Sequence, residues 1–195
     1  MPNLPSLLDR SVLIPSKVYN EDECVLQVSE RQRFFHQVGE KEYSYCNFTI
    51  REGDGHFQVH GLGKRFKLAR SLEEAKTAID DVEDTFDRHF QITTTIDEHY
   101  RKRDTEPDAL RIAIEACKDL IAMAERAAAS FRFQYTRPLP GHKGYEQLAI
   151  IREKQKDYKS AIELSQKAKK QGWAGDWDRR IVRCRRRMEK KDTNI

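Results

Sequence analysis

The fold predicted for the second half of this chain follows from residues 142–172, which read HKGYEQLAIIREKQKDYKSAIELSQKAKKQG. Apolar side chains recur there every three or four residues in two segments, 142–155 and 159–170, and this period predicts two helices. Gly172 follows the second segment, and glycine readily takes the left-handed conformation that closes a helix. The stretch therefore predicts a helix–turn–helix pair.

Small side chains lie where the two predicted helices would cross. Ala161 and Ala168 share one face of the second helix, and two helices approach closely only where such small residues meet. A single pair cannot bury its apolar face without neighbours. We therefore expect flanking helices, one over Leu110–Phe131 and one that begins near Asp176.

Residues 142–172 resemble a tetratricopeptide repeat, a helix–turn–helix of about 34 residues with small and aromatic residues at fixed offsets. The matching positions lie in the first helix, the turn and the second helix: Tyr145, Leu148, Ala149, Asp157, Tyr158, Ala161 and Ala168. The chain departs from the family pattern where Arg152 replaces a tyrosine and Gly172-Trp173 replaces the closing proline. The resemblance implies an interaction module that binds a protein or peptide in a groove, and it does not imply a catalyst.

Five side chains in or beside this pair are the candidates for contact with a protein partner: Tyr145, Arg152, Lys159, Trp173 and Trp177. Exposed indoles serve as anchors in protein interfaces, and the two basic residues would frame an acidic segment. The indoles have a second interpretation, in which they seal the end of the repeat core. We therefore predict a non-enzymatic interaction protein, and the sequence does not predict its oligomeric state.

The first half reads as an antiparallel β-meander. Apolar and polar residues alternate in three short runs between Tyr43 and Arg70, the first of them over 45–50. This period of two is typical of strands with one buried face. Glycines at 53–55 and 61–63 separate the runs, as in tight hairpin turns. Three strands are therefore predicted in this region.

A helix is predicted after the strands. Ser71 and Glu74 form a capping box, in which each side chain bonds an unpaired backbone N–H of the first turn. An apolar stripe continues to Phe90, and β-branched and charged residues break the pattern over 91–104. We therefore place a domain boundary near Asp104.

The predicted fold class is α+β, with a small antiparallel β-meander plus helix in 1–104 and an all-α tetratricopeptide-like domain in 105–195. Thr105 and Asp108 form a second capping box at the start of the helical domain. The chain carries 36 basic and 32 acidic residues, with net charge −4 before residue 105 and +8 from there on. Such a change of sign indicates two segments with separate surfaces.

The alternative function is nucleic-acid binding, since lysine and arginine neutralise phosphates and release counterions. The candidates lie on the last predicted strand and the last predicted helix: Lys64, Arg65, Lys67, Arg179, Arg183, Arg186 and Arg187. A solvated helix face is the competing interpretation of the arginines, because cations are favoured near a helix C-terminus.

Two clusters of titratable residues are candidates for metal or acid–base chemistry. His56 and His60 share a strand face and, with Cys46, would supply three zinc ligands, but their spacing matches no standard motif. Asp80 and Asp84 share a helix face, where acidic residues are usually solvated. The chain has no nucleophile elbow, phosphate-binding glycine loop or H-E-x-x-H. We therefore predict no catalytic, cofactor-binding or metal-binding residue.

The sequence also indicates where the protein works. It has no run of about 18 apolar residues, so a membrane-spanning helix is not expected. Its first ten residues lack the charged lead and apolar core of a secretory signal. Its four cysteines lie far apart, without metal-ligand spacing, which suits a reducing compartment. A cytoplasmic location is therefore expected.

Overall fold

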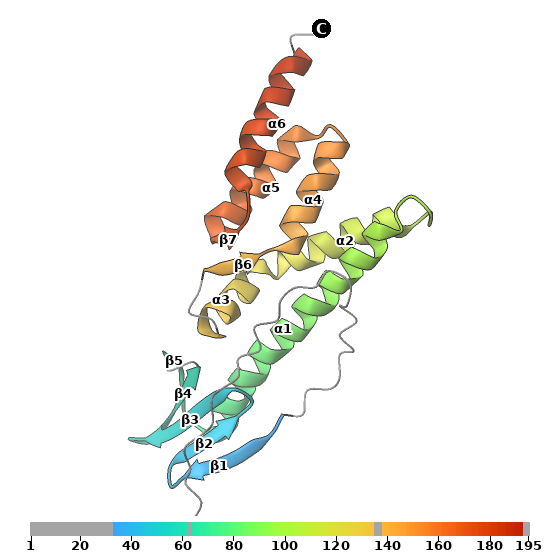
Figure 1. The fold of residues 1–195 in the computed structure, drawn as a ribbon. Helices are drawn as coiled ribbons and strands as arrows, with labels where there is room; N and C mark the ends of the chain where they lie inside the picture. The colour runs from blue at the N-terminus through green and yellow to red at the C-terminus, as the bar shows by residue number, and fades with distance from the viewer. Residues whose placement is uncertain (1–32, 62–63, 135–137, 193–195) are drawn as a thin grey trace, which may run out of the picture. The chain divides into compact units, whose positions relative to one another are not determined.

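The computed structural model describes residues 33–61, 64–134 and 138–192, which all belong to one compact unit, 31–195. Within the described residues, a five-stranded sheet comes first, six helices follow, and two very short strands lie among the helices. This arrangement confirms the predicted α+β fold class (Figure 1).

The sheet is an antiparallel meander in which each strand pairs with the next along the chain. Its strands are β1 (Phe35–Gly39), β2 (Glu42–Tyr45), β3 (Phe48–Gly53), β4 (His56–Gly61) and β5 (Lys64–Ala69). The prediction of three strands is therefore wrong in number. β1 precedes the predicted region, and all of its residues are exposed, so its burial does not follow the alternation that marks a strand with one buried face.

Cys46 divides the first predicted run into two strands. Its φ of +53° belongs to a tight turn, and Tyr45 pairs with Phe48 across that turn. Phe48 and Ile50 are buried as expected, whereas Cys46 lies outside both strands. Because Cys46 is apolar and precedes Phe48 by two residues, the period of two is unbroken in the sequence and conceals the turn.

One of the two bonds of the predicted capping box is present at the start of α1 (Leu72–Arg101). The backbone N–H of Glu74 donates to Oγ of Ser71 over 3.1 Å. The Glu74 carboxylate accepts from the N–H of Arg70, one residue before the cap, over 2.8 Å. One donor that the helix itself leaves unpaired, the N–H of Glu74, is thus satisfied as predicted, whereas the Glu74 side chain bonds Arg70 rather than Ser71.

The prediction that this helix ends near Phe90 is wrong, because α1 continues to Arg101 and is 30 residues long. Three threonines in the segment predicted as a break donate their hydroxyls to the carbonyl four residues earlier: Thr93, Thr94 and Thr95. This bonding satisfies their polar groups inside the helix. Ile96 of the same segment is fully buried, so packing stabilises the extension.

The single helix predicted over Leu110–Phe131 is two helices, α2 (Ala109–Ala122) and α3 (Ala124–Gln134). Met123 separates them, since its backbone angles are not helical. The apolar stripe continues across this one-residue interruption, so the periodicity of the sequence does not show it.

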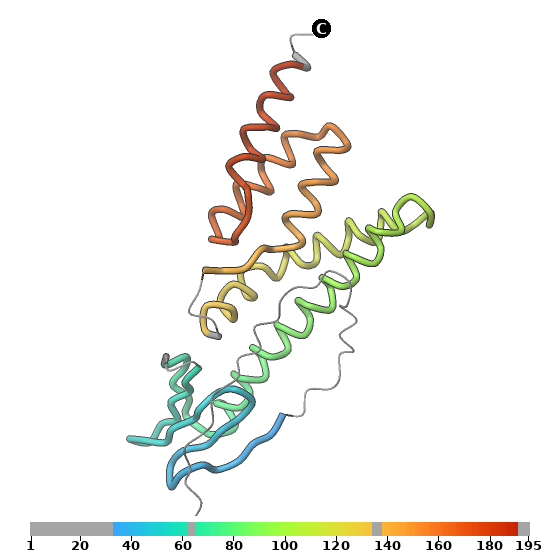
Figure 2. The backbone as a smooth tube through the Cα atoms, viewed as in Figure 1, coloured from blue at the N-terminus to red at the C-terminus, as the bar shows by residue number. Residues whose placement is uncertain are grey.

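The connection between α1 and α2 differs from the predicted capping box. Thr105 donates its hydroxyl to the carbonyl of Lys102 over 3.1 Å. Asp108 is the N-cap of α2, but its side chain makes no capping bond to the helix. The chain reverses direction at this connection (Figure 2), and the two helices pack along each other. Local bonds of the turn thus replace the predicted box.

The helix pair predicted over 142–172 is present, and Ala161 and Ala168 are fully buried in it. Gly172 ends the pair with a φ of +86°. The elements of this part are β6 (Leu139–Gly141), α4 (Lys143–Lys154), α5 (Tyr158–Gln171), β7 (Trp173–Ala174) and α6 (Trp177–Asp192). Helices α4, α5 and α6 lie side by side in chain order (Figure 1).

Two clusters of buried apolar side chains hold these elements together, since burial of apolar surface is the main favourable term in folding. The larger cluster joins Ile50 and Val59 of the sheet to α1, α3 and Trp173. The smaller one surrounds Cys117 and joins α1, α2 and α4. One continuous helix, α1, takes part in both. The domain division near Asp104 stays a prediction.

Candidate interaction surface on the last helix

Three of the five predicted partner contacts lie inside the protein. Tyr145 is fully buried, and Trp173 and Trp177 expose only 3% and 4% of their surface. The indole N–H of Trp177 donates to the carbonyl of Trp173 over 2.7 Å. This placement agrees with the interpretation that the indoles seal the core, and it corrects the assignment of these three residues as surface anchors.

The other two predicted partner contacts lie at the surface near the turn between α4 and α5. Arg152 donates to the side-chain oxygen of Gln155 over 2.9 Å, and its Nε lies 4.0 Å from the Asp157 carboxylate. Lys159 is exposed. Arg152 is thus held by residues of its own turn, and Lys159 is the more accessible of the two.

Two buried histidines pack against the indole of Trp173. The rings of His89 and His142 lie 5.6 Å apart, and the ring of His142 lies 4.6 Å from Trp173. Burial lowers the pKa of His89 to about 4, and burial followed by the charge of His89 lowers the pKa of His142 to about 3. Nδ1 of His142 accepts the N–H of Tyr145 over 3.3 Å, so it carries no proton. Both rings are therefore neutral parts of the core.

Glu153, near the end of α4, contacts three arginines of α6. Its carboxylate lies 2.6 Å from Arg180, and both side chains are almost completely buried, with exposed fractions of 10% and 6%. It also accepts two bonds from Arg183, over 2.9 and 3.0 Å. The guanidinium of Arg187 lies 3.5 Å away. Arg183 and Arg187, which the sequence suggested for nucleic acid, therefore contact this carboxylate, and 40% and 49% of their side chains remain exposed.

The electrostatics of Glu153 follow from these contacts. Burial acts to raise the pKa of its carboxyl group. The hydrogen bond from Arg183 and the charges of Arg180 and Arg183 outweigh burial and hold the pKa below its ordinary value. Glu153 is thus ionised at neutral pH and fixes the rotation of α6 about its own axis.

The solvent side of α6 carries three cations around one valine: Arg179, Val182, Arg186 and Lys190. We name these four residues the outer row. They follow one another at steps of three and four, so they share one face of the helix. No carboxylate of the described residues pairs with the three cations, and Val182 is 47% exposed.

The two described side chains of the predicted basic patch on the last strand, Arg65 and Lys67, have different surroundings. Nζ of Lys67 lies 3.2 Å from the Glu74 carboxylate at the start of α1. Arg65 is exposed and opposes His60 in the neighbouring strand. A bulge shifts the pairing of β4 with β5 between Val59, which opposes Lys67, and His60, which opposes Arg65. The side chain of Lys64 lies outside the described residues.

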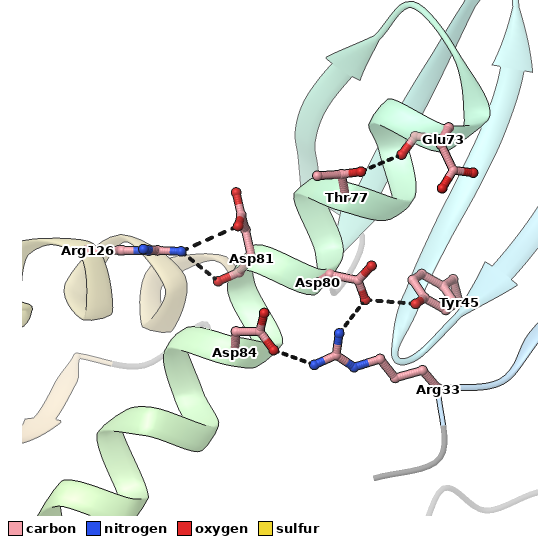
Figure 3. A network of polar contacts seen from close by, with 8 residues as sticks. All are labelled: Arg33, Tyr45, Glu73, Thr77, Asp80, Asp81, Asp84 and Arg126. Carbon is pink, nitrogen blue, oxygen red and sulfur yellow. Dashed lines mark hydrogen bonds and ion pairs between the residues drawn. The ribbon is translucent and has the colours of Figure 1, made fainter. Parts of the chain in front are cut away.

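The acidic face of α1 is paired with groups from the sheet region (Figure 3). Arg33 lies 2.7 Å from Asp80 and 2.5 Å from Asp84, and the phenol of Tyr45 donates to Asp80 over 2.7 Å. Burial, and then the hydrogen bond to Asp80, raise the pKa of Tyr45 to about 12. These carboxylates therefore attach the beginning of the sheet to α1.

The three candidate zinc ligands are spread over the sheet. His56 and His60 lie four residues apart in β4, which is about 13 Å along a strand. Cys46 lies in the turn before β3, beyond the end of the sheet opposite to His56. Across the described residues, no three histidine, cysteine or acidic side chains come together as a metal site.

Comparisons with protein-family models, with curated proteins and with solved structures found no match for this chain. The resemblance to a tetratricopeptide repeat therefore depends on the residues of 142–172 that carry it. None of the helices in the described ranges is both long enough and apolar enough to cross a bilayer.

Proposed function

We propose that this protein is a non-enzymatic, cytoplasmic interaction module that binds a protein partner through its helical half. One observation supports the proposal most directly. α6 is fixed to α4 through Glu153 on its inner side, and it presents the outer row on its other side. A fixed helix with an exposed, chemically distinct face is a common device for binding a partner helix.

The groove expected of a tetratricopeptide repeat is not the surface that we propose. α4 packs against α2 on one side and α5 on the other, and half of its residues are buried. Tyr145 takes part in that packing rather than in a groove. α6 follows the pair and keeps one side exposed, so a partner has access to it.

Nucleic-acid binding is the alternative, and the outward cations Arg179, Arg186 and Lys190 favour it. Arg183 and Arg187 contact Glu153 while 40% and 49% of their side chains stay exposed, and on the strand Lys67 pairs with Glu74. Together with Arg179, Arg186 and Lys190, the two arginines line one hollow, and these five cations give fewer contacts than the roughly six to ten phosphates that make DNA binding strong. A protein partner is therefore the better-supported proposal.

Affinity capture with the full-length chain tests the proposal, with and without nuclease and with mass spectrometry as the readout. Arg186→Glu in the outer row is matched by Arg185→Glu, an equal charge reversal on the next exposed residue, about 100° around the helix. Wild type and Arg185→Glu should retain the same protein, and Arg186→Glu should lose it. Capture that disappears with nuclease supports the alternative, and identical capture by all three chains contradicts the proposed surface.

A further inference from the structure

The outer row has the chemistry for one kind of partner. We propose that it binds an acidic amphipathic helix whose central apolar side chain covers Val182. This inference rests on the proposed function and names the chemistry of the partner. It follows from the spacing of the cations, the position of the valine and the fixed placement of α6.

The cations are spaced for a second helix. Arg179 and Lys190 lie about 16 Å apart along the axis, at 1.5 Å per residue. Arg186 lies between them, seven residues after the first and four before the second. Side chains of any α-helix recur on one face at these intervals. A partner helix laid along α6 therefore places carboxylates opposite the cations, where charge-assisted hydrogen bonds to arginine are strong.

Val182 favours a protein partner over a nucleic acid. A single exposed valine is ordinary on a protein surface, but this one lies on the same face as Arg179 and Arg186, between them in the sequence, and is 47% exposed. A duplex presents one phosphate charge per roughly 1.7 Å and no apolar group along its backbone. A leucine between two glutamates on a helix face covers the valine and pairs with both arginines.

Acidic residues beside the row also disfavour a continuous polyanion. Asp178 and Glu189 line the same shallow hollow as the outer row, together with Arg183 and Arg187. Asp178 also pairs with Lys169 over 2.7 Å. A phosphate strand that follows α6 would pass close to both carboxylates. A polypeptide can place neutral or basic side chains opposite them, so the alternation of charge on this face fits a protein.

The outer row is presented on a fixed helix rather than on a mobile tail. Trp177, Ile181 and Cys184 bury the inner face of α6, and Glu153 holds Arg180 and Arg183 beside them. Surfaces that are ordered before binding lose less conformational entropy when they bind. Only the exposed side chains need to become ordered here.

Fluorescence anisotropy with a labelled helical peptide tests the inference. The probe has roughly 18 residues, enough for a stable helix, and carries a central leucine with glutamates on the same face to each side. Its matched controls are a Leu→Ser peptide, a Glu→Gln peptide and a DNA duplex of comparable length. The full-length protein should bind the parent peptide about tenfold more tightly than either substituted peptide, and more tightly than the duplex.

Variants of the protein locate the site. Val182→Ser and Arg186→Gln should each weaken binding of the parent peptide by about tenfold, whereas Arg185→Gln should change it by less than about twofold. Circular dichroism checks that each variant is folded.

Three results would overturn the inference: no binding of the parent peptide, equal binding of the three peptides, or tighter binding of the duplex. An equal loss in Arg185→Gln and Arg186→Gln would do the same. The experiments distinguish failure of this inference from failure of the proposed function. If affinity capture recovers a protein that depends on Arg186 but the peptide does not compete with it, the interaction module stands and the partner chemistry is different.

Discussion

At the scale of single residues, Glu153 has the largest effect on the candidate surface. It is the only acidic group that the described residues place against Arg180, Arg183 and Arg187 together. Removal of one partner from a buried ion pair is costly because the remaining charge stays buried without compensation. The sequence does not single out Glu153, because its position near the arginines depends on how α4 and α6 both pack against α5.

We expect Glu153→Gln to lower the free energy of unfolding by about 3–5 kcal/mol, measured by urea denaturation at neutral pH. Glu146→Gln, an exposed position of the same helix, should change it by less than about 0.5 kcal/mol. The pKa of Glu153 is lower in the folded protein than the unfolded value of 4.5. Its stabilisation is therefore present above pH 4.5 and is lost as the pH falls through the folded-state pKa. Equal stabilities of the two variants would contradict this role.

His89 and His142 make stability depend on pH in a different range. Their pKa values of about 4 and 3 in the folded protein lie below the unfolded value of 6.5. The unfolded chain therefore binds more protons below pH 6.5, and stability falls as the pH falls toward 4. The expected loss between pH 7 and pH 5 is about 2 kcal/mol for each histidine.

His142→Asn is the variant that tests this pH dependence. Asparagine keeps an acceptor for the N–H of Tyr145 at the start of α4, and it does not titrate. The loss of stability between pH 7 and pH 5 should fall by about half, measured by denaturant unfolding at each pH. His36→Asn, an exposed histidine of β1, should leave the loss unchanged. A full pH dependence in His142→Asn would mean that this ring is charged in the folded state.

At the scale of elements, two local end signals are correct, and a third, the predicted capping box of Thr105 and Asp108, does not form. The capping box at Ser71 and the glycine at Gly172 place the start of α1 and the end of α5 correctly. The features that the sequence misses leave no mark in the period of apolar residues. α1 extends to Arg101, where Ile96 is buried against α2, and the turn at Cys46 follows from the pairing of Tyr45 with Phe48, three residues later. Local periodicity contains neither contact.

Gly172→Ala tests how much the closing residue of α5 contributes. Its φ of +86° is unfavourable for any residue with a Cβ, and the nearest atoms to an added Cβ lie at ordinary contact distances of 3.7 and 3.9 Å. The cost is therefore one of backbone conformation, and we expect a loss of about 1–2 kcal/mol in the free energy of unfolding. Gly53→Ala meets no atom within 4 Å and has no positive φ. Thermal unfolding should separate the two, and equal melting temperatures would contradict the role of Gly172.

At the scale of the whole molecule, the sequence leaves open which candidate residues lie in the core and which at the surface. Aromatic residues such as Tyr145 and Trp173 either fill cores or anchor interfaces. Which of the two holds depends on α1 and α3, which lie tens of residues earlier. Arg183 and Arg186 belong to one basic run and line the same hollow, but only the placement of α6 beside Glu153 gives Arg183 a carboxylate partner. The pattern of residues along the sequence contains neither of these contacts.

α1 joins the sheet to the helical half without a linker, so the described part should unfold in one transition. Val59→Ala removes buried apolar surface from β4 and should cost about 2 kcal/mol. The two tryptophans of the chain both lie in the helical half, so their fluorescence reports on unfolding far from the substitution. We expect the fluorescence and far-ultraviolet circular dichroism midpoints to shift together in urea, while Leu68→Ala at a half-exposed position shifts neither. A fluorescence midpoint that stays in place while circular dichroism shows two steps would mean that two domains unfold separately, as the boundary near Asp104 predicts.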